Sequence, residues 1–334
     1  MSDAIIIEGV TKTFGPKLAV ENLSLRVPRG SLTGVIGPNG AGKTTTIRMI
    51  MSIIFPDRGT LEVLGKKSAI ESKDLIGYLP EERGLYRKMK VGAFLMYLAQ
   101  LKGIDSGAAK KKAAEWLARV GLADVSKKKC EELSKGMQQK VQFIAAVIHE
   151  PQLLILDEVF SGLDPVNRLL MRELIDDQHR RGCTILFSTH GMHEAEQLCN
   201  HVLMIHRGRK VLDGSLRSIL SRFDHHSLAV ETVDPAGESL LARVEGVKSV
   251  RPGSESNPLC EVMLADGVDA TDALRRIVTA VPVRRIEQKR PTLEDVFIEL
   301  VMGGTAGGGG QGSEVDREKL RAQLATAGTE DFSS

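Results

Sequence analysis

Residues 35–45 read VIGPNGAGKTT and decide the fold of this chain. They contain the pattern GxxxxGK[ST], in which a glycine-rich turn leads directly into a lysine and a hydroxyl residue. The apolar run Leu32–Ile36 before the turn predicts a buried strand, and the residues after Lys43 predict a helix. The apolar side of that helix consists of Ile47, Ile50, Met51 and Ile54. A strand, a glycine turn and a helix in this order predict a phosphate-binding loop, whereas a turn without a ligand is the alternative.

The chemistry of a triphosphate explains the residue types in this loop. Backbone N–H groups must approach the phosphates closely, and glycine permits both the tight turn and the approach. Lys43 supplies a positive charge, and the Thr44 hydroxyl is placed to bind Mg²⁺ at the start of the helix. The predicted nucleotide-binding residues are Gly37, Pro38, Asn39, Gly40, Ala41, Gly42, Lys43, Thr44 and Thr45.

Length and composition limit the number of domains and the kinds of partner and site that the chain can have. The chain has 334 residues, enough for about two domains. A net charge of +2 and an aromatic content of 4% give no general attraction for nucleic acid, so no nucleic-acid partner is expected. The four cysteines form no C-x-x-C pair, which indicates neither a zinc site nor a disulfide framework. No apolar run reaches the length of a transmembrane helix, about 18 residues, so the chain is not expected to cross a membrane by itself.

Two further strands are predicted to end in chemically active side chains. The aliphatic run Leu153–Leu156 leads into Asp157 and Glu158, and the buried strand predicted at Thr184–Ser188 leads towards His190. Such runs predict central strands of a parallel sheet, and ligands of these sheets bind beyond the carboxyl ends of the strands. We therefore expect these three side chains to share one site with the phosphate loop. The alternatives are a helix-capping pair of carboxylates and an ordinary core histidine.

Beyond Phe223 the sequence changes character. Residues 227–288 alternate between short strand and helix patterns in the order βαββαβ, which is ferredoxin-like. A last helix at 293–301 is predicted to close this second core. Gly303–Gly312 contains seven glycines and predicts a flexible linker, and the tail after it is predicted to be disordered or to form a small docking helix. The predicted domains are 1–223 (with a helical subdomain at 86–150), 224–302 and 303–334.

The motifs of residues 4–222 together resemble the nucleotide-binding subunit of an ABC transporter. The resemblance implies an α/β fold with a P-loop NTPase sheet and an inserted helical subdomain, followed by the small α+β domain. It also implies ATP and Mg²⁺ as ligands, and ATP hydrolysis as the activity. The motifs follow the order of that family, with a Walker A loop at 37–45, a signature sequence at 133–137, Walker B at 153–158, a D-loop at 161–164 and the switch histidine at His190.

The resemblance implies a role for each side chain at the three strand ends. Asp157 and Thr44 hold Mg²⁺, and Glu158 polarises the attacking water. His190 contacts the γ-phosphate and orients that water. Lys43 completes the catalytic set. It stays open whether Glu158 acts alone as the base or in a dyad with His190.

The resemblance also extends the nucleotide site to more distant residues. Phe14 falls where the family has an aromatic side chain that stacks on adenine, and a place in the ordinary core is the alternative. Ser134, Gly136 and Asp164 belong to the signature sequence and the D-loop. In this family the signature helix points its N-terminus at the γ-phosphate held by a second subunit. The chain is therefore expected to form a homodimer, or a heterodimer with a paralogous ATPase subunit, around two shared ATP molecules.

Two other stretches narrow the resemblance within the family. IGYLPEERGLY at 76–86 and RPTLEDVF at 290–297 are similar to bacterial exporter ATPases of the sodium- and drug-efflux type. In these transporters the membrane part is a separate protein. The resemblance thus implies a cytoplasmic chain, bound at the inner face of the cell membrane through a separate integral-membrane permease.

Some residues depart from the family motifs. Glu81 stands where the family has a glutamine that contacts Mg²⁺ near the nucleotide; a carboxylate can still bind Mg²⁺ but adds negative charge near the phosphates. Lys135, Met137 and Val159 also depart, without removing an essential group.

Two alternative functions stay open: a soluble ABC-type ATPase that acts on ribosomes or nucleic acid, and a low-turnover regulator that responds to ATP.

Overall fold

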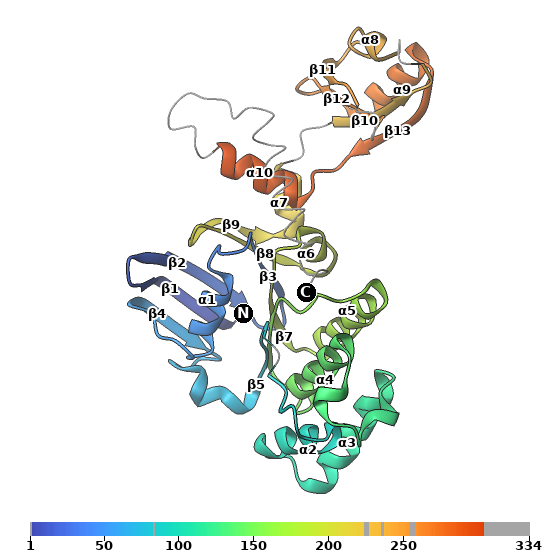
Figure 1. Ribbon diagram of the computed structural model, residues 1–334. Helices are drawn as coiled ribbons and strands as arrows, with labels where there is room; N and C mark the ends of the chain where they lie inside the picture. Colours follow the sequence, from blue (N-terminus) through green and yellow to red (C-terminus); the bar gives the residue numbers. More distant parts are fainter. Residues whose placement is uncertain (1, 83, 224–226, 235–236, 254–257, 304–334) are drawn as a thin grey trace. The chain divides into compact units, whose positions relative to one another are not determined.

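The computed structural model describes residues 2–82, 84–223, 227–234, 237–253 and 258–303 (Figure 1). The predicted tail, and the linker beyond residue 303, lie outside the described residues. By their internal contacts the described residues form two compact units. Unit 1 holds the residues up to Leu216 and those from Phe297 onward, and unit 2 holds Arg217–Val296.

The secondary structure of unit 1 begins with strands and ends with a hairpin. Its elements are β1 (Asp3–Phe14), β2 (Lys17–Pro28), β3 (Leu32–Ile36), α1 (Lys43–Ile50), β4 (Arg58–Val63), η1 (Ala69–Leu75), β5 (Ile76–Leu79), α2 (Val91–Leu101), α3 (Ser106–Arg119), η2 (Ala123–Val125), η3 (Cys130–Glu132), α4 (Lys135–Val147), β6 (Leu153–Asp157), α5 (Pro165–Arg180), β7 (Thr184–Thr189), α6 (Met192–Leu198), β8 (His201–His206) and β9 (Arg209–Ser215).

The central sheet of unit 1 positions the predicted site. Its described strands lie in the order β5-β6-β7-β3-β8-β9, parallel from β5 to β8, with β9 antiparallel to β8. Every residue of β3, β6 and β7 is buried, which explains why apolar and polar residues do not alternate along these strands. Because β6, β7 and β3 are neighbours, the three strand ends that carry the predicted residues lie side by side.

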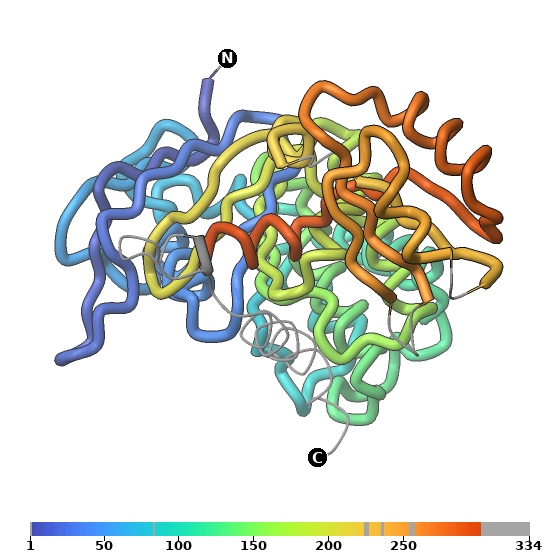
Figure 2. Tube along the Cα trace, turned by 90° about the horizontal axis from the view of Figure 1, so that it is seen from above, coloured from blue at the N-terminus to red at the C-terminus, as the bar shows by residue number. Residues whose placement is uncertain are grey.

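Different layers cover the two faces of this sheet. The antiparallel sheet β2-β1-β4 and helix α1 lie on one face, and helices α4, α5 and α6 lie on the other (Figures 1 and 2). The predicted α/β fold of the P-loop NTPase type is therefore confirmed. Strand β1 continues past Gly9 to Phe14, with irregularities in its pairing with β2.

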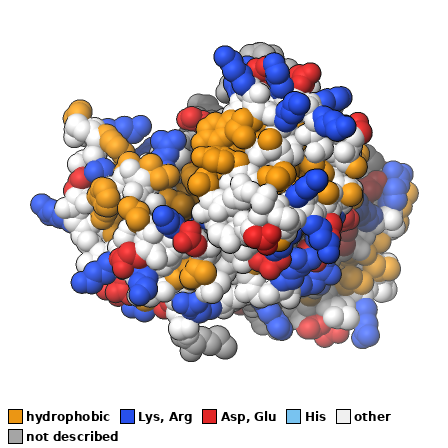
Figure 3. All heavy atoms as spheres, turned by 90° about the horizontal axis from the view of Figure 1, so that it is seen from below, with side chains coloured by type: hydrophobic (Ala, Val, Ile, Leu, Met, Phe, Trp, Pro, Cys, Tyr) orange, Lys and Arg blue, Asp and Glu red, His pale blue; other side chains and the backbone are white. Residues whose placement is uncertain are grey.

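The helical subdomain forms one end of unit 1. Helices α2 and α3 lie within the stretch 86–150 that was predicted to be helical, and Asp105 caps α3 by accepting hydrogen bonds from the backbone of residues 107 and 108. This end is seen from below in Figure 3, where hydrophobic side chains lie exposed among lysines and arginines. The short helix η1 was not predicted, since a single 3₁₀ stretch has no helical period in the sequence.

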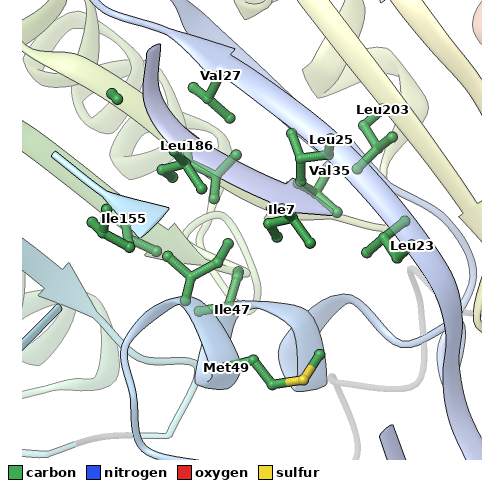
Figure 4. Close-up of a cluster of buried hydrophobic side chains, with 14 of the residues drawn as sticks. Ile7, Leu23, Leu25, Val27, Val35, Ile47, Met49, Ile155, Leu186 and Leu203 are labelled. Atoms are coloured by element: carbon green, nitrogen blue, oxygen red, sulfur yellow. The ribbon is translucent and has the colours of Figure 1, made fainter. Parts of the chain in front are cut away.

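A buried cluster attaches the phosphate-loop helix to the sheets. Figure 4 shows Ile7 and Leu25 of the antiparallel sheet pointing towards Val35 of the central sheet, with Ile47 of α1 beside them. All four side chains are inaccessible or nearly so. Burying one such side chain contributes about 1.5–3 kcal/mol, so the cluster holds α1, and with it the end of the phosphate loop, firmly in place.

Unit 2 is a small α+β domain. Its elements are α7 (Leu216–Arg222), β10 (Ser227–Thr232), α8 (Gly237–Leu241), β11 (Val247–Arg251), β12 (Cys260–Leu264), α9 (Ala270–Ala280), β13 (Val283–Lys289) and the start of α10 (Leu293–Gly303).

The described strands of unit 2 pair antiparallel in the order β11-β12-β10-β13. This is the split βαβ arrangement, and the ferredoxin-like prediction is confirmed. Helix α10 differs from its prediction. No α10 residue belongs to the described core of unit 2, and Phe297 instead packs its ring 5.6 Å from the ring of His206 in unit 1.

Candidate functional site

The phosphate loop joins β3 to α1, and its shape depends on glycine at two positions. At Gly37, where φ is +156°, a Cβ would lie 2.1 Å from the carbonyl oxygen of Ile205. At Gly42, where φ is +109°, a Cβ would lie 2.7 Å from the carbonyl oxygen of Ala19. No side chain caps the N-terminus of α1, and its first turn holds no acidic residue. The N–H groups of this turn are therefore available to an anion.

Lys43 connects this loop to the neighbouring strand ends. Its side chain is only 6% exposed, and Nζ donates to the carbonyl oxygens of Gly37 at 2.8 Å and Pro38 at 3.3 Å. Nζ also lies 3.2 Å from Oε1 of Glu158, which follows the last residue of β6. The ammonium thus forms an ion pair with a carboxylate that is itself 7% exposed.

Glu158 lies at the centre of the cluster. Its φ of +49° is a left-handed conformation that non-glycine residues adopt rarely and often at functional sites. Its Oε2 lies 2.9 Å from Nδ1 of His190. Burial alone raises the pKa of Glu158, but the bond from His190 and the charge of Lys43 outweigh it and hold the pKa below its usual value. The same bond raises the pKa of His190. Glu158 is therefore ionised at neutral pH, as a general base must be.

Asp157 provides a test of whether Mg²⁺ fits. The residue is 1% exposed, and its Oδ1 accepts hydrogen bonds from Thr44 Oγ1 at 3.4 Å and from Ser188 Oγ. Its Oδ2 is buried and has no hydrogen-bond partner among the described residues. Burial raises the pKa of Asp157, so the isolated carboxylate is costly to ionise. A hard cation would relieve that cost, and a carboxylate oxygen beside a threonine hydroxyl is a donor set that suits Mg²⁺.

Glu81 lies just beyond β5, at the edge of the same cluster. Its side chain is accessible to solvent, yet partial loss of solvation and the neighbouring charges of Asp157 and Glu158 raise its pKa, while Lys43 opposes them. Glu81 makes no hydrogen bond or ion pair with the described residues. The structure thus leaves this carboxylate unattached and close enough to the two buried carboxylates to interact with them.

Phe14 lies at the end of β1 and is 49% exposed, so it is not a core residue. The charged Nζ of Lys12 lies 5.5 Å from the ring centroid. Asp57 fixes this end of the strand, since it accepts hydrogen bonds from Lys12 and from the backbone and hydroxyl of Thr13. These bonds lower the pKa of Asp57 to about 2. The adjoining β2 carries Ala19, which approaches Gly42 of the phosphate loop.

Ser134, Gly136 and Asp164 form a second, separate group. Ser134 caps α4, and Asp164 caps α5 by accepting hydrogen bonds from the backbone and side chain of Asn167. A Cβ at Gly136 would lie 3.0 Å from Nδ2 of the same Asn167, so the two helix starts meet there. Within the described residues, no hydrogen bond or ion pair joins this group to the Lys43 cluster. Ser134 is exposed, and the first turn of α4 has no acidic residue.

The sequence did not single out several residues that contact the site. Ser188 binds Asp157, and Gln139 of α4 donates to the carbonyl oxygen of Val159 at 3.2 Å. Tyr78 is half-buried, and its burial and the charge of Asp157 raise its pKa to about 12. The one available signal was a polar residue, Ser188, within a strand that was predicted to be buried.

Comparisons with family profiles match three ranges of residues in the chain. The family profile "ABC transporter" matches residues 20–161, "ATP-binding protein DrrA1-3-like, C-terminal domain" matches residues 214–301, and an AAA domain profile matches residues 130–194. The first two profiles together extend across both units of the structure.

Individual relatives are similar over most of the chain. The uncharacterized ABC transporter ATP-binding protein YhaQ of Bacillus subtilis is 40% identical over 297 residues, which is 89% of this chain and 98% of that protein. The linearmycin resistance ATP-binding protein LnrL of the same organism is 32% identical over 301 residues, or 88% of this chain and 96% of that protein.

A solved structure is similar to the ATPase part. It is described as the ATP-binding subunit of an ABC transporter and matches with a TM-score of 0.61 at 29% sequence identity. The match covers 66% of this chain and 93% of that chain. Among the described residues, no helix combines the length and the apolar character that crossing a membrane requires.

Proposed function

The chain belongs to the family of ABC transporter ATP-binding proteins, which are ATPases coupled to transport, and on this basis we propose that two copies of it close around two ATP molecules to drive an exporter. One observation carries the proposal. The buried carboxylate of Glu158 lies 3.2 Å from Lys43 Nζ and 2.9 Å from His190 Nδ1, beside a glycine loop that opens a helix. These are the charges and the geometry that attack of water on a phosphate requires.

The proposed reaction assigns a task to each of these side chains. Lys43 exchanges its carbonyl partners for oxygens of the outer phosphates. Glu158 accepts a proton from the attacking water, whose oxygen bonds to the γ-phosphorus while the bond from that phosphorus to the bridging oxygen breaks. ADP leaves with the bridging oxygen. His190 keeps Nδ1 on Glu158 and presents its other ring nitrogen for the γ-phosphate.

Thr44 and Asp157 are proposed to hold Mg²⁺, which neutralises charge on the outer phosphates when it is bound. The support is the unpartnered Oδ2 of Asp157. Glu81 is proposed as a further ligand in place of the usual glutamine, since its charge already interacts with Asp157. Phe14 is proposed to stack on the adenine, because its exposed ring lies at the end of β1, which pairs with β2 next to the loop.

The shared site is proposed because, among the described residues, no hydrogen bond or ion pair joins the second group to the Lys43 cluster of its own subunit. Ser134, which is exposed, and Gly136 lie at the start of α4, whose first turn holds no acidic residue, and the N-terminus of a helix favours an anion. A γ-phosphate of a second subunit supplies that anion in the proposed dimer, and Asp164 lies beside the same helix start. The second subunit is another copy of this chain or a paralogous ATPase.

The permease is proposed to dock on the helical subdomain. Tyr86 and Tyr97 are 53% and 41% exposed, and their ring centroids lie 6.1 Å apart. With Met89 and two basic residues they line a hollow of about 470 Å³. An aromatic hollow with a basic rim fits an amphipathic helix of a membrane protein. The chain then lies in the cytoplasm, peripheral at the inner face of the membrane, and the relative named for linearmycin resistance supports export as the direction.

Glu158→Gln tests the hydrolysis. The variant should bind ATP as the wild type does and lose turnover by about 10²–10⁴-fold, because the general base is removed while the shape of the side chain is kept. Glu150→Gln is the matched control, since that carboxylate lies on the surface and pairs with Lys112. Turnover of Glu158→Gln at the rate of the control would refute the assignment.

A photo-crosslinking amino acid tests the docking surface. Placed at Tyr97, it should capture a multi-span membrane protein when the tagged chain is purified from membranes of its own host. Placed at Phe55, which is 65% exposed and outside the helical subdomain, it should not. Capture of ribosomal proteins from Tyr97 would favour the soluble ATPase hypothesis and refute the proposed permease contact.

A further inference from the structure

Ser188 is a buried polar residue of the central sheet. It lies on β7 between Phe187 and Thr189, and its side chain is fully buried. In the parallel pairing of β6 with β7 it stands directly opposite Asp157. A buried hydroxyl must find partners or it costs free energy, so its contacts reveal why it is tolerated there.

Both partners of Ser188 are residues of the candidate site. The hydroxyl donates to Oδ1 of Asp157 and accepts the backbone N–H of Glu158 at 3.2 Å. The carbonyl oxygen of Ser188 lies 3.2 Å from that same N–H. A serine hydroxyl has one donor and two acceptor positions, so one side chain can serve both carboxylate residues at once.

Each of these contacts has a consequence for the chemistry. With Oδ1 of Asp157 occupied by Ser188 and Thr44, the oxygen left without a partner is Oδ2, and it alone is available to a cation. The bond to the backbone of Glu158 supports a residue with a φ of +49°, a conformation that needs support from its surroundings. That conformation in turn sets where the Glu158 carboxylate meets Lys43 and His190.

We infer that Ser188 is a positioning residue that fixes the rotation of Asp157 for Mg²⁺ and the backbone of Glu158 for the attacking water. It acts through the two carboxylates and touches neither the nucleotide nor the cation. The inference rests on the proposed function, because it assigns a task within the same ATP site. Partners of a metal ligand typically change metal affinity by about 10–100-fold when they are removed.

The test measures cation binding directly. Mn²⁺ replaces Mg²⁺, and the electron paramagnetic resonance signal of free Mn²⁺ is followed during titration of the full chain with a non-hydrolysable ATP analogue. Ser188→Ala should weaken Mn²⁺ binding by about 10–100-fold. Ser188→Cys, which keeps the volume with a poor donor, should do the same, and Ser188→Thr should stay close to the wild type. Thr184→Ala is the control, since it removes a buried hydroxyl from the far end of the same strand.

Nucleotide affinity in EDTA separates positioning from a general structural role. The inference predicts that the Ser188 variants bind the analogue in EDTA as the wild type does, and that only the Mn²⁺ affinity falls. Equal Mn²⁺ affinity in Ser188→Ala, Ser188→Cys and Thr184→Ala overturns it. A parallel loss of nucleotide affinity in EDTA also overturns it in favour of a structural role. A wild-type chain that binds no analogue at all refutes the proposed function, and the inference falls with it.

Discussion

Replacing Lys43 by methionine tests how much the buried ion pair between Lys43 and Glu158 stabilises the nucleotide-free protein. Methionine keeps most of the volume of the lysine stem but removes the ammonium, so Glu158 loses the charge 3.2 Å from its Oε1. Both side chains are more than nine-tenths buried, so water does not replace the lost partner. Removing one member of a buried ion pair costs about 3–5 kcal/mol.

We expect Lys43→Met to lose about 3 kcal/mol of unfolding free energy, the lower end of this range, because the hydrogen bond from His190 to Glu158 remains. For a unit of this size, 1 kcal/mol shifts Tm by about 2–4 °C, so Tm should fall by about 6–12 °C. The pKa of Glu158 is held below its usual value. The stabilisation is therefore fully present above the unfolded pKa of about 4.3 and is lost as the pH falls through the lowered value. The difference in Tm between the wild type and Lys43→Met should therefore become smaller in acid.

The assay is thermal unfolding of the nucleotide-free chain, followed by circular dichroism. The double variant Lys43→Met/Glu158→Gln supplies the control, since a neutral glutamine no longer needs the ammonium and should recover part of the lost stability. A Tm for Lys43→Met that differs from the wild type by less than about 2 °C, or a double variant less stable than Lys43→Met, would refute the reasoning.

Three further predictions follow from the site geometry. In NMR spectra the pKa of His190 should lie above the usual value of about 6.5, because the bond to Glu158 favours the protonated ring. In Glu158→Gln this pKa should return towards the usual value. The stability that the pair contributes is present below about pH 6.5 and is lost as the pH rises through the raised pKa. Gly37→Ala should lower Tm more than Gly40→Ala, since a Cβ meets backbone only at the first position, and equal shifts would contradict this. Phe14→Ala should weaken ATP binding by about tenfold and leave tripolyphosphate binding unchanged in calorimetry.

The sequence could predict that Lys43, Glu158 and His190 lie together, because its motifs follow strand ends. Gly37 to Thr44, Asp157 and His190 each come after an apolar run, and parallel strands end at the same edge of a sheet. The strand order that makes these ends neighbours is β6-β7-β3, and it depends on pairing between segments far apart in the chain. Only the structure supplies it.

The contacts that the sequence missed depend on tertiary register. Ser188 binds Asp157 because β7 and β6 pair with these two residues opposite each other, and no local pattern encodes that register. The positive φ of Glu158 is likewise invisible in a sequence, since glutamate has no preference for it. Helix α10 was assigned to the second core from its apolar pattern, but a pattern does not identify the surface that it buries, and Phe297 packs with His206.

The central claim is that the site is completed by a second subunit. The most direct measurement is the mass of Glu158→Gln in solution, by light scattering, with saturating ATP and Mg²⁺ and again without nucleotide. We expect a dimer that retains two ATP molecules, and a monomer when Ser134→Arg is added, because the larger side chain blocks the exposed start of α4. A Glu158→Gln chain that binds ATP and stays monomeric at every concentration would contradict the proposed shared site.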